Sequence, residues 1–326
     1  MVKIAIDVMG GDHGVAPLVQ GCHRALIQNP SLQLQLIGDT DQIERCLSSL
    51  IRVQAANSLR GRIEIVHAPI EIDMTDDPLS SLRNKTDSSM AVAMDLLASH
   101  STSAVVSAGN TGALVAFGVQ KVGTREGISR PAICTQIPTN SGRTWLLDLG
   151  ATLANDEARL VELAKLGAQQ ARDYDSLTKP KVALLNIGVE LMKGTRELQG
   201  AASALELEEG LQYDGFIEGS SIFSGDVDVV VCDGFSGNVA IKTAQGIASL
   251  LMSKFAAASR SNLLTRAVLA IIAPALRHLG DDLSPSLYNG APLLGLRQLV
   301  VKSHGNADAF SFANAIGVAT KMAAAS

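Results

Sequence analysis

One pattern of apolar and polar positions recurs along the chain. A short run rich in β-branched residues ends in glycine or a polar residue, and a helix-like stretch follows. The five pairs are KIAIDVMGGD before APLVQGCHRAL, VVSAGNTG before ALVAFG, TWLLDLGA before NDEARLVELAKLGAQQA, KVALLNIG before GTRELQGAASALELEE, and DVDVVVCDGFSG before NVAIKTAQGIASLL. Strands that alternate with helical patterns in this way indicate βαβ units and a parallel sheet.

Further strands are predicted at LQLQLIGD, RIEIVHAPI and LGLRQLVVKSHG, the last before a final helix at DAFSFANAIGVATKMAAA. The sequence therefore predicts an α/β fold of the three-layer α/β/α, Rossmann-like class with a mainly parallel sheet. No low-complexity linker or block of like charges interrupts the chain. Residues 1–326 are therefore expected to form a single domain with a cleft, rather than two separate units.

Residues 241–289 break this rhythm, because they hold long helical patterns and no convincing strand. The apolar residues at the spacing of one helix face are Leu264, Val268, Ile271, Ala275 and Leu279. Arg266 and Arg277 share another face, and Pro274 should kink or end the helix. Two interpretations stay open: a packed helical hairpin or dimer interface, or a helix on a membrane surface with arginines beside its apolar side.

Composition and charge narrow the classes of function. The chain is 47% hydrophobic but only 3% aromatic, so a large core of aliphatic residues is expected. With a net charge of -5 and few aromatic residues, it offers neither a basic face nor stacking platforms, and no nucleic-acid partner is expected. The first residues do not resemble a signal peptide and no apolar run is long enough to span a bilayer, so a cytoplasmic protein is expected.

Several familiar sites have no support in the sequence. No CxxC pair occurs and the histidines lack paired spacing, so no metal centre is predicted and the cysteines are expected to be reduced core residues. A GxSxG elbow, a P-loop and a GxGxxG after a strand are also absent, which argues against a serine hydrolase and against NAD or ATP as the resident ligand. No cofactor is predicted.

The predicted strands end in polar residues, most of them Asp or Asn. Ligands of open α/β sheets bind beyond the carboxyl ends of the strands, so a shared site is expected there. The strand-end residues are Asp7, Asp12, Asn110, Thr111, Asp148, Asn186, Asp233 and Asn238. Each of them alone could simply cap the next helix, because its side-chain oxygen can accept hydrogen bonds from free backbone N–H groups. Five such junctions in one chain favour the shared site.

Two of these junctions have the same form, a strand followed by G-x-x-G and a helix. They are the loops that run from Gly109 to Gly112 and from Gly234 to Gly237. Glycine lets a ligand approach the backbone N–H groups, and a helix start suits an anion such as phosphate. A G-x-x-G also occurs in ordinary turns. We expect both helix starts to face one cleft.

Cationic and hydroxyl side chains provide further candidates for binding an oxyanion. Arg83, Lys85 and Ser88 lie close together in LRNKTDSSM, before a predicted helix. The alternative for this group is a solvated helix start with serine caps. Lys193 lies in a loop after a strand end, and His304 closes another strand. A lone loop lysine is usually solvated and a lone histidine is more often structural, so these alternatives stay open.

Eight motifs in order resemble those of one family. They are IDVMGGDHG, LRNKTDSSM, SAGNTGALVA, LLDLGA, LLNIGVELMKG, VDVVVCDGFSGNVAIKT, NGAPLLGL and KSHGNADAFSFANAI. In this order, from residue 3 to about residue 316, they resemble the bacterial phosphate acyltransferases of phospholipid synthesis. The resemblance implies a fold similar to the isopropylmalate dehydrogenase and phosphotransacetylase group.

The resemblance also implies a reaction and its partners. Inorganic phosphate attacks the thioester of a fatty acyl chain on acyl carrier protein, which gives acyl-phosphate and free carrier protein. A membrane glycerol-3-phosphate acyltransferase then uses the acyl-phosphate. The family is homodimeric, metal-free and cytosolic with peripheral membrane association, so the same is expected of this chain.

Three residues are assigned to catalysis: Lys193 and Asn238 from the resemblance, and Asn110 from its place in the 109–112 loop. Lys193 matches the lysine of the family's KG motif and Asn238 the asparagine of its GN motif, so both are expected at the active site. Lys193 would neutralise charge on the phosphate or the oxyanion, and Asn238 would donate to the acyl carbonyl. Asn110 and its loop would hold phosphate or the pantetheine end of the donor. The other candidates above are expected to bind substrate.

The sequence departs from the family's usual pattern at three places. Val189 stands where an acidic residue is usual, Ser220 and Ser221 replace an Arg-Asp pair, and Thr152 replaces an asparagine. Changes in a site can abolish transition-state binding, so a catalytically inactive membrane scaffold of the same fold stays an alternative. The nearest enzyme alternative is a short-chain phosphotransacetylase that uses acyl-CoA.

Overall fold

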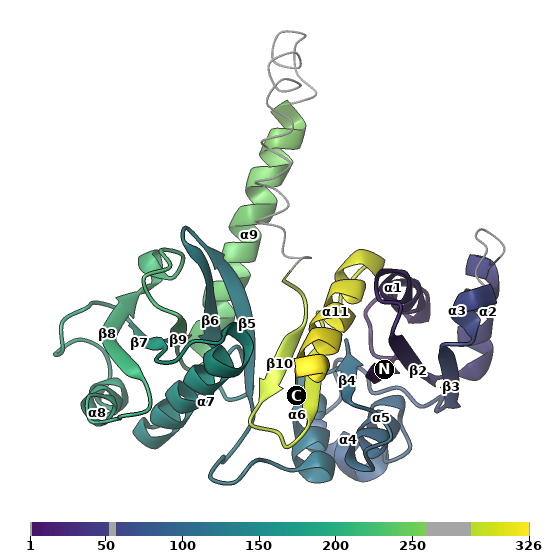
Figure 1. Ribbon diagram of the computed structural model, residues 1–326, viewed down its shortest axis with the longest axis horizontal. Coiled ribbons are helices and arrows are strands. Elements are labelled where there is room, and N and C mark those ends of the chain that lie inside the picture. Colours follow the sequence, from purple (N-terminus) through teal and green to yellow (C-terminus); the bar gives the residue numbers. More distant parts are fainter. Residues whose placement is uncertain (1, 52–56, 259–287, 326) are drawn as a thin grey trace.

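The strands of the protein join into one continuous sheet. The computed structural model describes residues 2–51, 57–258 and 288–325. In these ranges the strands are β1 (Val2–Asp7), β2 (Leu32–Gly38), β3 (Ile63–His67), β4 (Ala104–Ser107), β5 (Ala132–Thr139), β6 (Gly142–Leu147), β7 (Lys181–Asn186), β8 (Gln212–Glu218), β9 (Val229–Val231), β10 (Ala291–Leu294) and β11 (Leu299–Lys302). Their order across the sheet is β3-β2-β1-β4-β11-β10-β5-β6-β9-β7-β8 (Figure 1).

Helices follow most of these strands. They are α1 (Val15–Gln28), α2 (Thr40–Ile51), α3 (Asn57–Arg60), α4 (Pro78–Asn84), α5 (Ser89–Ala98), α6 (Thr111–Phe117), α7 (Glu157–Asp175), α8 (Arg196–Leu205), α9 (Gly234–Ala258) and α11 (Ala309–Ala325). A π-helical turn η1 (Gly118–Val122) continues α6, and a 3-10 turn η2 (Gly219–Ser221) follows β8. All the helices that the apolar patterns predict within the described ranges are present.

The sheet consists of two parallel halves joined by antiparallel strands. β3, β2, β1, β4 and β11 are parallel neighbours, and so are β6, β9, β7 and β8. Between them, β10 and β5 pair antiparallel with each other and with their outer neighbours. The prediction of a mainly parallel α/β sheet is confirmed. The apolar pattern does not predict β5, β8 and β10, because polar residues interrupt β5 and β8 and because β10 is only four residues long.

Helices cover both faces of each half, which makes the three-layer α/β/α arrangement. In the amino-terminal half, α1 and α11 pack on one buried apolar cluster and α5 and α6 on another. In the other half, α7 and α8 cover one cluster, and α9 begins beside the other. The clusters consist largely of Ala, Val, Leu and Ile, as the low aromatic content predicts.

Helix α9 projects away from the body of the molecule (Figure 1). It covers the first part of the predicted helical stretch 241–289, and its last described residue is Ala258. The apolar residues of its projecting part include Ile247, Leu250 and Leu251, each about half exposed. The predicted helix face with Leu264, Val268, Ile271, Ala275 and Leu279, together with Arg266, Pro274 and Arg277, lies outside the described residues.

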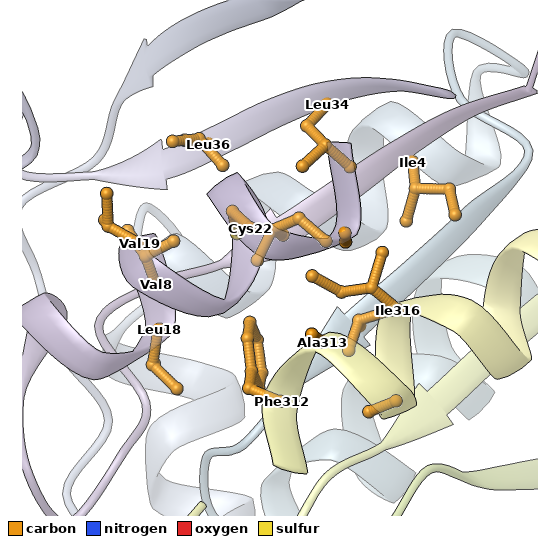
Figure 2. Packing of buried hydrophobic residues seen from close by; sticks show 14 of the residues in the cluster. Ile4, Val8, Leu18, Val19, Cys22, Leu34, Leu36, Phe312, Ala313 and Ile316 are labelled. Carbon is orange, nitrogen blue, oxygen red and sulfur yellow. The ribbon is translucent and has the colours of Figure 1, made fainter. Parts of the chain in front are cut away.

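The cluster between α1 and α11 shows how the core is packed. Figure 2 shows Phe312 and Ile316 of α11 beside Leu18 and Cys22 of α1, under the strands that carry Ile4, Leu34 and Leu36. Phe312 and Cys22 have no exposed surface. Burial raises the pKa of the Cys22 thiol, so this cysteine behaves as an apolar core residue.

We predict that Phe312→Ala lowers the free energy of unfolding by about 3–5 kcal/mol, because a buried ring is replaced by a cavity. Urea unfolding followed by circular dichroism measures this loss. Phe310→Ala is the matched control, since Phe310 lies two residues earlier in α11 and is 37% exposed. Equal losses for the two variants would contradict the packing described for Phe312.

Candidate functional site

The carboxyl ends of β1, β4 and β11 lie side by side and place polar groups at one edge of the sheet. At the end of β1, the buried Asp7 accepts hydrogen bonds from the Ser89 and Ser107 hydroxyl groups, each at 2.7 Å, and from the Met9 amide at 3.2 Å. Burial raises the pKa of Asp7, and these hydrogen bonds oppose the shift. Asp7 therefore ties two strand ends to the start of α5 and acts as a positioning residue.

The 109–112 loop leaves its central amides open. Its first amide donates to the Ser107 hydroxyl at 3.0 Å, and the Ala113 amide beyond it donates to Asn110 Oδ1 at 3.1 Å. Between these bonds, the amides of Thr111 and Gly112 donate to no group in the ranges that the structure describes. Two N–H groups at the start of α6 are thus without a partner in those ranges, and their role in binding a ligand stays a prediction.

Asn110 holds the segment that lies over this loop. While Oδ1 caps α6, Nδ2 donates to the backbone carbonyls of Asp73, Met74 and Asp76 at 3.3, 3.1 and 3.0 Å. The side chain is 8% exposed. These contacts make Asn110 a helix cap and a brace for residues 73–76, and its catalytic assignment stays a prediction.

The group at residues 83–88 is largely engaged within the protein. The Lys85 ammonium pairs with the Asp76 carboxylate at 2.6 Å and donates to the Glu71 carbonyl at 2.9 Å. Ser88 is the N-cap of α5, and its hydroxyl accepts a backbone amide at 3.3 Å. Ser88 therefore fits the capping alternative. Arg83, in the last turn of α4, has an exposed side chain.

Two lysines that are not among the predicted site residues, Lys302 and Lys242, lie at the same edge of the sheet. Lys302 ends β11, and its Nζ donates to the carbonyls of Ala108, at 3.2 Å, and of Ser303. Burial lowers the pKa of Lys302 to about 8, with Asp12 opposing the shift and Lys242 adding to it. The Asp12 side chain is exposed. The backbone amide of Asp12 donates to the carbonyl oxygen of residue 305, in the loop between β11 and α11, at 2.8 Å and so keeps Asp12 at this edge.

The first turns of α9 approach this edge from the other half of the sheet. Gln245 Nε2 lies 3.4 Å from His304 Nε2. Lys242 precedes Gln245 by about one helical turn and Asn238 precedes it by about two, so the three residues share one face of α9. Burial, together with Lys242 and Lys302, lowers the pKa of His304 to about 4. The imidazole is therefore neutral at pH 7.

Simple rules applied to the sequence identify both lysines. Lys242 follows Asn238 by four residues on a predicted helix, so the two share a face. Lys302 follows the apolar residues of the predicted strand LGLRQLVVKSHG and is the last residue of the observed strand β11. Lys302 is not among the predicted site residues, because only Asp, Asn, Thr and His side chains at strand ends are considered as candidates.

The Gly234–Gly237 loop differs from its sequence counterpart because its amides are engaged. Its first two amides donate to the carbonyls of Thr152 and Leu153 at 3.0 and 3.3 Å, and its last two donate to Asp233. A Cβ at Gly237 would overlap the carbonyl oxygen of Asp148. These glycines allow close packing on the neighbouring turn, and their N–H groups are not open to an anion. Asp233 caps α9, which is the alternative foreseen for it.

Asp148, at the end of β6, organises that neighbouring turn. Its buried carboxylate accepts the Ile133 amide at 3.0 Å and three amides of the 149–152 turn at 3.2, 3.1 and 2.8 Å. Burial raises the pKa of Asp148, and the four amides oppose the shift. Asn238 Nδ2 donates to the carbonyl of Leu149 in the same turn at 3.2 Å. Asp148 therefore helps to position Asn238 without contacting it through its carboxylate.

The loop after β7 carries Lys193. The buried Asn186 accepts the Ile187 amide at 2.8 Å and donates to the Lys193 carbonyl at 3.1 Å, which closes the loop. The Lys193 side chain is exposed. Ile187 and Met192 are 81% and 83% exposed, so this loop presents apolar side chains to its surroundings.

The structure brings some of the predicted site residues together and leaves others apart. Backbone and side-chain contacts bring Asp12, the 109–112 loop, His304 and the Asn238 face of α9 near one another where the two halves of the sheet meet. This region is the candidate cleft. Lys193 follows β7, five strand positions from β11, or about 24 Å along the sheet. Within the described residues, the backbone hydrogen bonds of Lys193 stay inside its own loop and the start of α8.

Three further features of the described part of the chain concern metal-ligand clusters, membrane-spanning helices and cavities away from the strand ends. His, Cys, Asp and Glu residues do not gather there in groups of three that could hold a metal ion. No helix in those ranges is both long and apolar enough to cross a bilayer. A cavity of about 720 Å³ lies at the opposite edge of the sheet, beside Thr102 and Gln298 before β4 and β11, and is therefore remote from the cleft.

Comparisons with known proteins follow the whole chain. Residues 2–326 match the family model described as "Fatty acid synthesis protein". The chain is 44% identical over 313 residues to "Phosphate acyltransferase" of Pseudomonas syringae pv. tomato, covering 96% of this chain and 90% of the relative. It is 42% identical over 320 residues to "Phosphate acyltransferase" of Hydrogenovibrio crunogenus, covering 98% and 93%.

A solved structure supports the fold. A phosphotransacetylase from Streptococcus pyogenes superimposes with a TM-score of 0.64, covering 100% of this chain and 94% of the other, at 18% sequence identity. This likeness confirms the prediction of a phosphotransacetylase-like fold.

We predict that Asp148→Asn lowers the free energy of unfolding by about 1–3 kcal/mol, because an amide N–H₂ then faces backbone N–H groups in a buried turn. Hydrogen exchange of the amides of residues 150–152 should also accelerate. Asp226→Asn is the control, since Asp226 is exposed. Unchanged exchange in Asp148→Asn would show that the carboxylate does not hold this turn.

Proposed function

Because this chain belongs to the phosphate acyltransferase family, we propose that it transfers a fatty acyl group from acyl-acyl carrier protein to inorganic phosphate. The acyl-phosphate formed would serve phospholipid synthesis through a membrane glycerol-3-phosphate acyltransferase. The observation that carries the proposal is the identity of more than 40% with phosphate acyltransferases over nearly the whole chain.

The proposed reaction joins one phosphate oxygen to the thioester carbon and breaks the C–S bond. The electron pair of that bond goes to the sulfur, and the proton of HPO₄²⁻ ends on the thiol of the carrier. Phosphate is already a nucleophile at neutral pH, so the reaction requires binding and charge stabilisation more than a strong base. A cleft with open amides, Asn238, lysines and a neutral His304 suits these requirements.

We assign the roles as follows. The 109–112 loop, with its open amides at Thr111 and Gly112, holds the phosphate or the pantetheine end of the donor. Asn238 donates to the acyl carbonyl with the N–H that does not bind Leu149, a preorganised contact worth about 3 kcal/mol of barrier. Lys193 neutralises the oxyanion from the 187–194 loop.

The remaining strand-end residues support these groups. Asp7 and Asp148 fix the turns beneath the cleft, and Asp233 fixes the start of α9. Asn186 closes the loop that carries Lys193. Arg83 and Lys85 remain candidates for binding substrate at the α4–α5 segment.

We further propose a cytoplasmic homodimer that associates peripherally with the membrane. Support comes from α9, which projects from the body and exposes Ile247, Leu250 and Leu251 on the face opposite to Asn238 and Lys242. A second copy of the chain would cover this apolar face. No metal or cofactor enters the proposed reaction.

The main alternative is a short-chain phosphotransacetylase, which the likeness in fold to such an enzyme favours. We predict that purified protein forms acyl-phosphate from palmitoyl-carrier protein and phosphate with a kcat/KM at least about tenfold above that for acetyl-CoA, since uniform donor use would mean no recognition of chain or carrier. The reverse preference would establish the alternative. Absence of turnover with both donors would favour the inactive scaffold.

We predict that Asn238→Ala lowers kcat about 100-fold, because one oxyanion donor is lost. Lys193→Ala should also reduce acyl-phosphate formation. The matched control is Asn140→Ala, since Asn140 has an exposed side chain in the β5–β6 turn. Full activity in both Asn238→Ala and Lys193→Ala would overturn the assigned roles.

A further inference from the structure

We infer that Lys302 and Lys242 hold the phosphate substrate between them, in the cleft where the end of β11 faces α9. The two lysines come from opposite halves of the sheet and supply the cationic part of the site next to the 109–112 loop. This inference rests on the proposed function, because it takes phosphate as the substrate.

Lys302 is held in a fixed place. Its Nζ donates to the carbonyls of Ala108 and Ser303, at the ends of the adjacent parallel strands β4 and β11. An ammonium group has three N–H donors, so the two carbonyls leave one for a ligand. Ala108 directly precedes the 109–112 loop, so the Lys302 ammonium group lies at the start of that loop.

Lys242 reaches the cleft from α9. Gln245, one turn later on the same helix face, contacts His304 just beyond the end of β11. The face that Lys242 shares with Asn238 is therefore turned toward Lys302, and the two lysine charges are close enough to influence each other. Lys242 itself is exposed, so its side chain can adjust to a ligand.

The charged groups around the two lysines allow an anion to bind between them. The groups that face the two lysines are Asp12 and His304, with Asp7 beneath them. His304 is neutral at pH 7, and the Asp7 oxygens accept hydrogen bonds from two hydroxyl groups and the Met9 amide. Asp12 and Asp7 both act on Lys302 as negative charges, and the Asp7 oxygens are already engaged by hydrogen bonds within the protein. Two lysines that repel each other across a cleft gain most from a doubly charged ligand, and HPO₄²⁻ has that charge.

The placement also suits the reaction. Lysine binds phosphate as a point charge, which leaves other phosphate oxygen atoms free to attack the thioester. The Asn238 side chain on the same face of α9 is available to the acyl carbonyl. Phosphate held by Lys302 and Lys242 would lie within one or two helical turns of that carbonyl. The nucleophile and the electrophile would then be bound by neighbouring residues.

Steady-state kinetics with inorganic phosphate as the varied substrate tests the inference. Lys302→Met should raise the KM for phosphate at least about tenfold, because a charge-assisted hydrogen bond is lost, and should leave the KM for palmitoyl-carrier protein within about twofold. Lys302→Arg should retain part of the phosphate affinity. Lys179→Met is the matched control, since Lys179 is exposed and precedes β7 at the opposite edge. An unchanged KM for phosphate in a folded Lys302→Met would overturn the assignment to Lys302.

Lys242→Met gives a second test that does not depend on a buried residue. Its side chain is exposed, so the variant should fold, and the KM for phosphate should rise several-fold. If Lys302→Met does not fold, an unchanged KM in Lys242→Met overturns the inference.

Isothermal titration of the proteins with inorganic phosphate separates this inference from the proposed function. If wild-type protein binds phosphate and both methionine variants do not, the site stands even when no acyl-phosphate forms. If acyl-phosphate forms normally and both variants bind phosphate as wild type does, the site is wrong and the function stands.

Discussion

The position of every residue at the cleft depends on one short backbone pairing in the middle of the sheet. Leu293 and Leu294 of β10 pair with Ile133 and Ala132 of β5, and this pairing joins the two parallel halves. The connecting loops extend it, since the amides at residues 125 and 297 donate to the carbonyls at 295 and 123. The antiparallel strands β10 and β5 thus separate two sets of parallel strands whose carboxyl ends contribute to one cleft. Lys302 belongs to one set and α9 follows the other, so their separation is fixed by this central pairing.

Most of the fold could be predicted from the sequence because parallel strands that are buried on both faces have continuous apolar sequences. The runs that end at Asp7, Ser107 and Asn186 are of this kind, and each is a strand in the structure. The strands that join the two halves do not have continuous apolar sequences of detectable length. β5 contains Thr135, Gln136 and Pro138, and β10 is too short to show a period, so neither could be found from its pattern.

The site was harder to predict than the fold, because capping a helix and binding a ligand require the same side-chain oxygens in the same place. Asn110 and Asp233 satisfy the strand-end rule and Ser88 precedes a predicted helix, and all three accept a backbone amide at a helix start. The two G-x-x-G loops show the same ambiguity at the level of the backbone. One has open amides, whereas the amides of the other donate to Asp233 and to the carbonyls of Thr152 and Leu153. The contacts with Thr152 and Leu153 are tertiary contacts that no local pattern records.

Helix α9 has a consequence for how assembly and catalysis are related. One face of the helix carries Asn238, Lys242 and Gln245 toward the cleft, and the opposite face exposes Ile247, Leu250 and Leu251. If the cleft binds phosphate as proposed, any partner that binds the apolar face and shifts the helix would also change the affinity for phosphate. Thermodynamic linkage makes this coupling reciprocal: the factor by which the partner alters anion affinity equals the factor by which the anion alters partner affinity. Through this one helix, partner binding on the outer face of α9 and ligand binding in the cleft would then affect each other.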